Sequence, residues 1–325
     1  MDDTGQLWSA GVREGVQRGS RVHLTEFFGP VLGIMTAATL EVAIEIQNEV
    51  DYGLTAGLHS LDPDEVALWL DRVEAGNLYV NRGTTGAVVR RQPFGGWKKS
   101  AVGSGYKAGG PNYLVGLGGW VPAVHGPIDE AVDGPAARLL TAGTEALTAT
   151  ELDFLRRAFA SDSRAWRTEF GVAKDVSGLT AERNVFRYRP VPVHVRLAEG
   201  GSTASLVRVL GAAATVGAPV DVSSGAAQTT EVTSVLTALG HTVTEQTDAA
   251  WLNDMARRAP ARIRLIDGDT NALAERIGGR PDVAVHDRPV TEAGRLELLP
   301  FVREQTISIT AHRFGTQNYL TDGII

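Results

Sequence analysis

Two stretches near the start of the chain combine residue types that bind small molecules. The first is the pentapeptide Glu26-Phe27-Phe28-Gly29-Pro30, in which a carboxylate precedes aromatic rings and a turn. A carboxylate can accept two hydrogen bonds from a diol, and an aromatic ring gives a flat apolar wall against which a planar group can lie. Taken alone, the pentapeptide is equally compatible with an ordinary strand-to-turn transition.

The second stretch runs from Gly76 to Ser100 and contains the octapeptide Pro93-Phe-Gly-Gly-Trp-Lys-Lys-Ser100. Adjacent glycines permit a close approach of the backbone and positive φ where a side chain would block a channel. The preceding loop holds Thr84-Thr-Gly-Ala87, whose backbone N–H groups suit a carboxylate because they donate without steric bulk. A plain turn is the alternative interpretation of those four residues.

Four cations flank these motifs and could form an anion site: Arg90, Arg91, Lys98 and Lys99. Ion pairs or a solvated rim are the preferred interpretation, because exposed cations commonly do no more. Asn81 is interpreted as a residue that braces the loop through hydrogen bonds.

Composition excludes several classes of chemistry. The chain has no cysteine, which excludes disulfides, thiolate metal ligands and thiol nucleophiles. Its seven histidines show no metal-ligand spacing, so no metal site is expected. The net charge of −7 and the lack of long basic runs argue against nucleic acid as a partner. No apolar run reaches the ~20 residues that span a bilayer, and no signal peptide is visible, so the cytoplasm is expected.

The pattern of elements predicts a domain over residues 1–120, a linker over 121–150 and a second domain over 151–325. In the first domain we expect a strand over 31–35, a helix over 39–48 and a strand over 77–81, which leads into the loop. A further helix should begin after Asp62, as N-cap, and end at Gly76, as C-cap. One short helix is expected in the linker, around 136–140.

The second domain alternates strands with helices, which predicts a parallel, doubly wound sheet. Strands are expected at 191–197, 220–222, 241–244, 262–266 and 282–285, with a last one over 304–311. The first turn, Ala198-Glu-Gly-Gly-Ser-Thr203, lacks the Gly-x-Gly-x-x-Gly fingerprint and places Glu199 where a phosphate would lie. A folded scaffold is therefore preferred to a nucleotide site.

Three motifs, residues 26–30, 76–81 and 93–100, in this order resemble the aldehyde dehydrogenase superfamily, in which the first and third have the patterns E-x-F-G-P and P-F-G-G-x-K-x-S. The resemblance implies that Glu26 accepts hydrogen bonds from the ribose hydroxyls of NAD. It also implies that Phe28 packs near the nicotinamide ring.

The loop over 82–92, with Lys107-Ala-Gly-Gly-Pro-Asn-Tyr113 beyond it, resembles L-glutamate γ-semialdehyde dehydrogenase (Δ1-pyrroline-5-carboxylate dehydrogenase) of the bifunctional proline utilization (PutA) type. This implies that the backbone of Gly86 and Ala87 binds the substrate's α-carboxylate and that Phe94 packs on its aliphatic stem. Residues 183–190 and 305–315 resemble the C-terminal domain of longer PutA proteins. The fold implied is α/β: the C-terminal half of an aldehyde dehydrogenase catalytic domain, then a Rossmann-like domain with a β-flap.

In this family the nucleophilic Cys, the catalytic Glu and Asn, and the NAD-binding domain all precede the E-x-F-G-P segment. The resemblance therefore predicts the C-terminal portion of an enzyme of proline catabolism, with no catalytic residue of its own and no activity alone. Its apolar surface should be exposed where the N-terminal half would pack. The expected partner is that half or a second copy of the chain.

Three alternatives stay open. The chain could be a non-catalytic oligomerisation or lid module for a separately encoded protein. It could belong to an aldehyde dehydrogenase with another substrate, such as succinate semialdehyde. It could also bind a nucleotide through its second domain.

Overall fold

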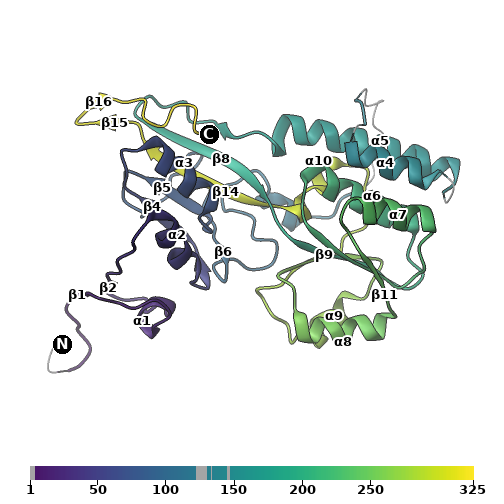
Figure 1. The fold of residues 1–325 in the computed structure, drawn as a ribbon, viewed down its shortest axis with the longest axis horizontal. Helices are drawn as coiled ribbons and strands as arrows, with labels where there is room; N and C mark the ends of the chain where they lie inside the picture. The colour runs from purple at the N-terminus through teal and green to yellow at the C-terminus, as the bar shows by residue number, and fades with distance from the viewer. Residues whose placement is uncertain (1–3, 122–129, 133, 145–146) are drawn as a thin grey trace. The chain divides into compact units, whose positions relative to one another are not determined.

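The computed structural model describes residues 4–121, 130–132, 134–144 and 147–325. The chain folds into two compact units, and the ribbon in Figure 1 follows it through both. The first unit consists of residues 1–101, 175–185 and 306–325, and the second of residues 102–174 and 186–305.

These units cut across the three segments that the sequence predicts. The reason is that two long strands, β8 (Glu182–Pro190) and β14 (Val302–Thr310), each begin in one unit and end in the other. The predicted division into domains 1–120 and 151–325 with a linker stays a prediction. The compact units have other boundaries, which fall within β8 and β14.

The first unit contains a five-stranded sheet with the order β4-β5-β14-β8-β7. Strand β5 runs parallel to β4 and to the end of β14, so Val80 lies beside Leu58 on one side and Ile309 on the other. Helices α2 and α3 contribute to the core beneath it, in which Trp69 and Ile307 are buried. The remaining elements of the sheet and its helices are α2 (Leu40–Asn48), β4 (Thr55–Leu58), α3 (Pro63–Arg72), β5 (Asn77–Val80) and β7 (Lys174–Asp175).

Smaller elements complete this unit. Strands β1 and β2 form a parallel pair, β3 and β6 an antiparallel pair, and β15 and β16 a short antiparallel hairpin. Their bounds are β1 (Gly11–Arg13), α1 (Arg21–Leu24), β2 (Val31–Gly33), β3 (Tyr52–Gly53), β6 (Trp97–Lys98), β15 (His312–Arg313) and β16 (Thr316–Gln317).

Helix α3 begins as predicted and ends earlier than predicted. The Asp62 side chain accepts hydrogen bonds from the backbone of Asp64 (2.8 Å) and Glu65 (3.4 Å), which confirms the N-cap. The predicted C-cap at Gly76 is wrong, because the helix ends at Val73, where the backbone becomes extended. Gly76 instead donates its N–H to the Gly53 carbonyl at 2.9 Å and so starts the path into β5.

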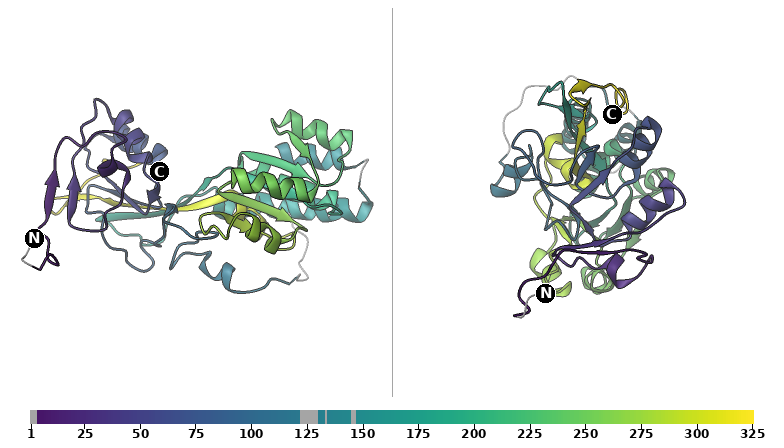
Figure 2. Two further views of the ribbon diagram at one scale, coloured as in Figure 1. Left: turned by 90° about the horizontal axis from the view of Figure 1, so that it is seen from below. Right: turned by 90° about the vertical axis from the view of Figure 1, so that its left-hand side faces the viewer.

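The second unit is built on a five-stranded sheet with the order β11-β10-β9-β12-β13, all of whose described pairings are parallel. The predicted doubly wound α/β fold is therefore confirmed. Helices α4 to α7 pack on one face and helices α8 and α9 on the other, as Figures 1 and 2 show. The bounds are α6 (Thr203–Val216), α7 (Thr230–Ala238), α8 (Asp248–Arg258), α9 (Thr270–Arg276), β9 (Val193–Leu197), β10 (Val220–Ser224), β11 (Val243–Glu245), β12 (Arg262–Ile266) and β13 (Ala284–His286).

Two predictions about this unit need correction. The last strand, β14, pairs with β5 and not with the parallel sheet. The short helix expected around 136–140 is present as the longer α4 (Gly134–Gly143), but the predicted linker also holds the start of the long α5 (Ala149–Ala165), which a Thr148–Glu151 capping box begins. Helix α5 is not among the predicted elements. The shorter elements are η1 (Tyr113–Leu117), η2 (Trp166–Phe170), α10 (Gly294–Glu297) and η3 (Leu299–Phe301).

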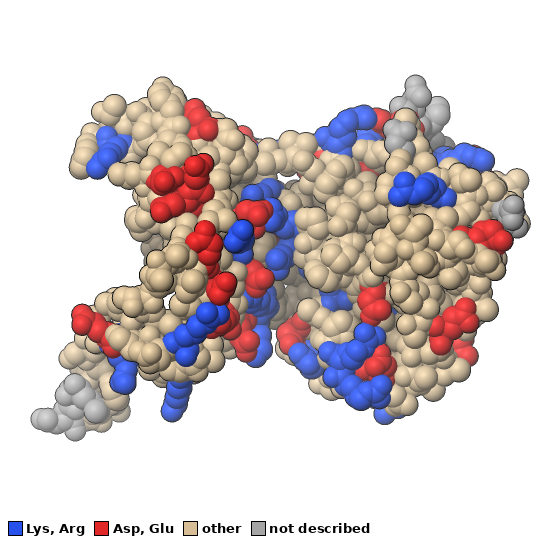
Figure 3. All heavy atoms as spheres, in the orientation of Figure 1, with Lys and Arg blue, Asp and Glu red and all other residues tan. Residues whose placement is uncertain are grey.

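Surface charge on the face drawn in Figure 3 mixes both signs. Arg257 and Arg258 of α8 both form ion pairs with Asp254. In the part of the chain that the structure describes, no helix has the length and apolarity needed to cross a membrane.

Candidate functional site

The Glu26 and Phe28 side chains lie in the turn between α1 and β2. Phe28 has a φ of 50° and is 94% exposed, so its ring packs on nothing within the described chain. Both residues line a hollow of 320 Å³ together with Val22, Thr25, Phe27, Gly29, Val31 and Gly33. An exposed carboxylate beside an exposed ring is compatible with a diol and a flat ring as ligands.

Apolar side chains of the N-terminal segment of this unit face solvent. Trp8, Val12, Val31 and Leu32 are all more than half exposed, with Leu32 at 57%. The exposed apolar surface that the sequence predicts in this unit is therefore present. A patch of this kind indicates an interaction site for another protein segment.

The loop over residues 83–92, which we term the 83–92 loop, leaves β5 and carries Gly86 and Ala87. Gly86 has a φ of +86°, a conformation that suits glycine. Its carbonyl accepts a hydrogen bond from the Tyr79 hydroxyl at 2.8 Å. Burial raises the pKa of Tyr79, against the opposing charge of Arg82, so the hydroxyl is kept as a donor. Within the described residues, the exposed amides of Gly86 and Ala87 have no acceptor, which leaves them for a ligand.

The far end of the loop is closed by Gln92. Its side-chain oxygen accepts from the Val88 amide at 2.8 Å, and its own amide donates to the Val88 carbonyl at 3.0 Å. The Gln92 Nε2 group donates to Asn184 Oδ1 on β8 at 2.9 Å. The loop is thus tied to β5 near its middle, at Gly86, and to β8 at its end, at Gln92.

Glu182 on β8 binds two arginines of this region. Its carboxylate oxygens lie 2.6 Å from Arg82 Nη1 and 2.7 Å from Arg91 Nη1. Burial alone would raise the pKa of Glu182, but the hydrogen bond and charge of Arg82, helped by Arg91, lower it below its ordinary value. These three residues line a pocket of 520 Å³ with Gly83, Thr85, Leu179, Thr180, Ala181, Thr310 and His312.

The other cations near the motif also pair with acidic groups. Lys98 lies 2.9 Å from Glu74, and Lys99 lies 2.5 Å from Asp51. Ion pairing, the preferred interpretation from the sequence, is confirmed for these two and for Arg91. The interpretation of Asn81 is confirmed as well, because its side chain exchanges hydrogen bonds of 3.0 and 2.8 Å with the backbone of Ser60.

Phe94 is half-buried. Its motif, residues 93–100, is held by hydrogen bonding to the side chain of Asn77. The buried Asn77 Nδ2 group donates to the Gly95 carbonyl at 3.1 Å, and Thr306 Oγ1 donates to Asn77 Oδ1 at 2.8 Å. A Cβ at Gly96 would lie 2.5 Å from the Ser100 carbonyl oxygen, so the backbone approaches Ser100 closely there, and the open substrate channel stays a prediction. The predicted positive φ is not found at Gly95 or Gly96.

Gly86, Ala87 and Phe94 all lie on the connection between β5 and β6. The hollow lined by Glu26 and Phe28 shares no lining residue with that loop or with the arginine pocket. No sequence motif singles out Tyr79, Glu182 or Asn184. Glu182 binds Arg82, 100 residues away along the chain, and Asn184 binds Ser308, 124 residues away, so no local pattern marks these two.

The segment from Lys107 to Asn112 lies in the second unit, and both of its end residues are buried. Glu304 accepts hydrogen bonds from the Lys107 amide (2.5 Å) and from Asn112 Nδ2 (2.6 Å), and Asn112 also donates to the Tyr188 hydroxyl at 2.9 Å. Burial lowers the pKa of Lys107 to about 7 and raises that of Glu304. This segment is a fixed structural element of its unit.

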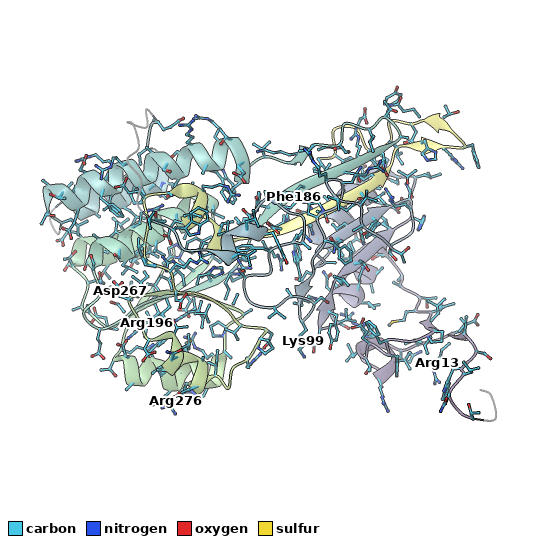
Figure 4. All side chains as sticks on the ribbon, turned by 180° about the vertical axis from the view of Figure 1, so that it is seen from behind. Arg13, Lys99, Phe186, Arg196, Asp267 and Arg276 are labelled. Atoms are coloured by element: carbon cyan, nitrogen blue, oxygen red, sulfur yellow. The ribbon has the colours of Figure 1, made fainter. Side chains whose placement is uncertain are left out.

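The first turn of the parallel sheet uses its own amides internally. Ala198 donates to the Ile266 carbonyl at 3.0 Å, and Glu199 donates to the Asp248 carboxylate at 3.2 Å. Beneath the turn, Arg196 of β9, labelled in Figure 4, donates to Asp248 at 2.6 Å and lies over the Trp251 ring. These contacts fit a folded scaffold. No group of three or more metal-binding side chains occurs among the described residues.

Comparison with known proteins assigns the segment that carries the motifs. Residues 1–115 match the aldehyde dehydrogenase family. Over 114 residues this segment is 39% identical to 1-pyrroline-5-carboxylate dehydrogenase of Staphylococcus epidermidis and 40% identical to that of Staphylococcus haemolyticus. Each match covers 35% of this chain and 22% of the relative.

Solved structures extend the similarity beyond the family segment. Proline utilization A from Corynebacterium freiburgense is 44% identical, with a TM-score of 0.76 over 97% of this chain and 29% of that chain. A Thermus 1-pyrroline-5-carboxylate dehydrogenase with bound NAD is 35% identical over 35% of this chain and 22% of that chain, with a TM-score of 0.33. The chain therefore spans less than a third of the length of these relatives. The similarity to proline utilization A includes both units.

Proposed function

We propose that the chain is the substrate-binding and lid portion of an NAD-dependent dehydrogenase that oxidises L-glutamate γ-semialdehyde to L-glutamate in proline catabolism. It acts in the cytoplasm, as a homodimer or together with a segment that supplies the thiolate and the NAD domain. These 325 residues contain no cysteine, so they are inactive by themselves.

The observation that carries the proposal is the 83–92 loop. Two exposed neighbouring amides, at Gly86 and Ala87, have no acceptor within the described chain and lie on a loop that is held at Gly86 and at Gln92. Such an arrangement can receive a carboxylate, because neighbouring N–H donors stabilise its charge without steric bulk. The half-buried Phe94 follows in the same connection and suits an aliphatic stem.

Bound NAD supplies the acceptor for the hydride that leaves the aldehyde carbon. The chain's own residues bind and orient the cofactor and the substrate. Glu26 offers its carboxylate to the ribose hydroxyls, and Phe28 offers its ring to the nicotinamide. Gly86 and Ala87 hold the α-carboxylate, so that the aldehyde end of the substrate points away from the loop. Holding a substrate at its remote end lowers the entropic cost of reaching the transition state.

The test measures NADH formation from L-glutamate γ-semialdehyde by the chain alone and after mixing with the N-terminal part of a proline utilization A dehydrogenase domain. We expect the chain alone to form no NADH and the mixture to form NADH. Ala87→Pro removes one N–H donor and should raise the KM about tenfold, the usual order for a charge-assisted hydrogen bond. The matched control, Thr85→Ala, leaves the backbone amides in place and should not change the KM.

A second substrate separates recognition from damage. The Ala87→Pro enzyme should keep its KM for an aldehyde of similar length that lacks the α-carboxylate. An equal loss with both aldehydes would contradict the assigned role of the loop. Silence of the mixture with every aldehyde, despite a stable complex, would instead favour the non-catalytic lid module.

A further inference from the structure

The strand β8 contacts the 83–92 loop although it lies far outside the family segment of residues 1–115. Glu182 and Asn184 alternate with Arg183 along the strand, so their side chains leave the same face of it. Both reach the loop region: Glu182 through Arg82 and Arg91, and Asn184 through Gln92.

Asn184 is itself held rigidly. It is 2% exposed, and its Nδ2 group donates to Ser177 Oγ at 3.1 Å. Its Oδ1 atom accepts from Ser308 Oγ at 3.1 Å as well as from Gln92, and its amide donates to Asp175 at 2.9 Å. A buried polar group with all these partners has one orientation, so the position of Gln92 is set by β8.

Glu182 fixes the arginines at the two ends of the same loop. Arg82 precedes the loop and Arg91 lies within it, and one carboxylate binds both. Charge-assisted hydrogen bonds of this length are stronger than neutral ones. The carboxylate therefore joins the loop's ends, while the middle, with Gly86 and Ala87, faces solvent.

We propose that Glu182 and Asn184 are positioning residues, which hold the 83–92 loop in the form that binds the substrate carboxylate. This inference rests on the proposed function. It goes further by assigning part of substrate recognition to a strand outside the aldehyde dehydrogenase segment. Neither residue touches the substrate; each acts through the loop.

The first test uses the isolated chain and needs no activity. Hydrogen exchange is measured at the amides of Val88, Arg91 and Gln92, which are hydrogen-bonded within the loop. Asn184→Ala should speed their exchange about tenfold and Glu182→Gln about threefold, because each change makes local opening easier. The control Asp322→Asn breaks the neighbouring ion pair to Arg183, on the same strand, and should leave the loop unchanged.

The second test measures the reconstituted enzyme. Glu182→Gln and Asn184→Ala should raise the KM for L-glutamate γ-semialdehyde at least threefold with little change in kcat, the pattern of lost ground-state and transition-state binding alike. Asp322→Asn should change neither constant. A KM that stays constant while loop exchange accelerates would overturn the positioning role.

The two tests separate this inference from the proposed function. If the mixture with the unmodified chain forms no NADH, the proposed function is refuted. The hydrogen-exchange measurement still decides in that case whether β8 holds the loop. Unchanged exchange in both variants, with normal protection of β5, would refute the inference alone. Glu182→Gln keeps the test valid if Asn184→Ala fails to fold, since Glu182 is partly exposed.

Discussion

Replacing Gly96 by alanine gives a sharp test of the motif at residues 93–100. The added Cβ would lie 2.5 Å from the Ser100 carbonyl oxygen and would also overlap the Ser100 side chain. A backbone oxygen cannot rotate away, so Ser100 must shift. That shift breaks the hydrogen bond from the Gly53 amide to Ser100 Oγ, now 3.2 Å.

The magnitude follows from these contacts. Overpacking of a fixed site costs about 1–3 kcal/mol, and a lost hydrogen bond adds about 1 kcal/mol. We therefore expect Gly96→Ala to lower the free energy of unfolding by about 2–4 kcal/mol. For a unit of this size that corresponds to a melting temperature lower by about 8–16 °C.

The assay is thermal unfolding of the purified chain, followed by circular dichroism. Gly83→Ala is the matched control, because Gly83 lies in the adjoining loop with nothing within 4 Å of an added Cβ. It should change the stability by less than about 0.5 kcal/mol. If the melting temperatures of Gly96→Ala and Gly83→Ala differ by no more than a degree or two, the close approach at Gly96 does not exclude a side chain there. The reasoning would then be wrong.

Three further changes test the packing and charge of the two units. Arg208→Met leaves the fully buried Asp162 without its bidentate partner and should cost about 3–5 kcal/mol in urea unfolding; a cost below about 1 kcal/mol would contradict this. Glu182 has a lowered pKa, so its contribution to stability is complete above the ordinary value of 4.5 and is lost as pH falls further. The stability difference between the unmodified chain and Glu182→Gln should accordingly shrink in that acid range, as unfolding at a series of pH values will show. Gly211→Ala places a Cβ inside the buried Phe159 ring and should destabilise by about 1–3 kcal/mol despite better helix propensity, whereas an equal or higher melting temperature would show that the ring can move.

The parallel sheet of the second unit can be predicted from the sequence because its signals are local. The apolar strands near 193–197 and 262–266 alternate with helices long enough for crossovers, and that order alone selects the topology. Helix α5 escapes the prediction although its capping box, Thr148 with Glu151, is visible in the sequence. The Pro- and Gly-rich run before it extends the predicted linker too far.

The pairing of β14 cannot be predicted, because the sequence of an apolar strand does not specify which other strand it pairs with. Residues 304–311 have the pattern of a strand, but their partner β5 lies more than 200 residues earlier in the chain. The same limit applies to the candidate site. The motifs name Gly86, Ala87 and Phe94, while the residues that hold their loop, Glu182 and Asn184, are fixed only by tertiary structure.

The place of β14 in the first unit has a consequence for biosynthesis. One of the two neighbours of β5, residues 306–309, is synthesised more than 200 residues after β5 itself. Until then β5 has an open edge, which is a template for wrong pairing. The loop that β5 carries cannot reach its final form before those later residues have been made. Translation of residues 306–309, not of the family segment, therefore times the maturation of the site.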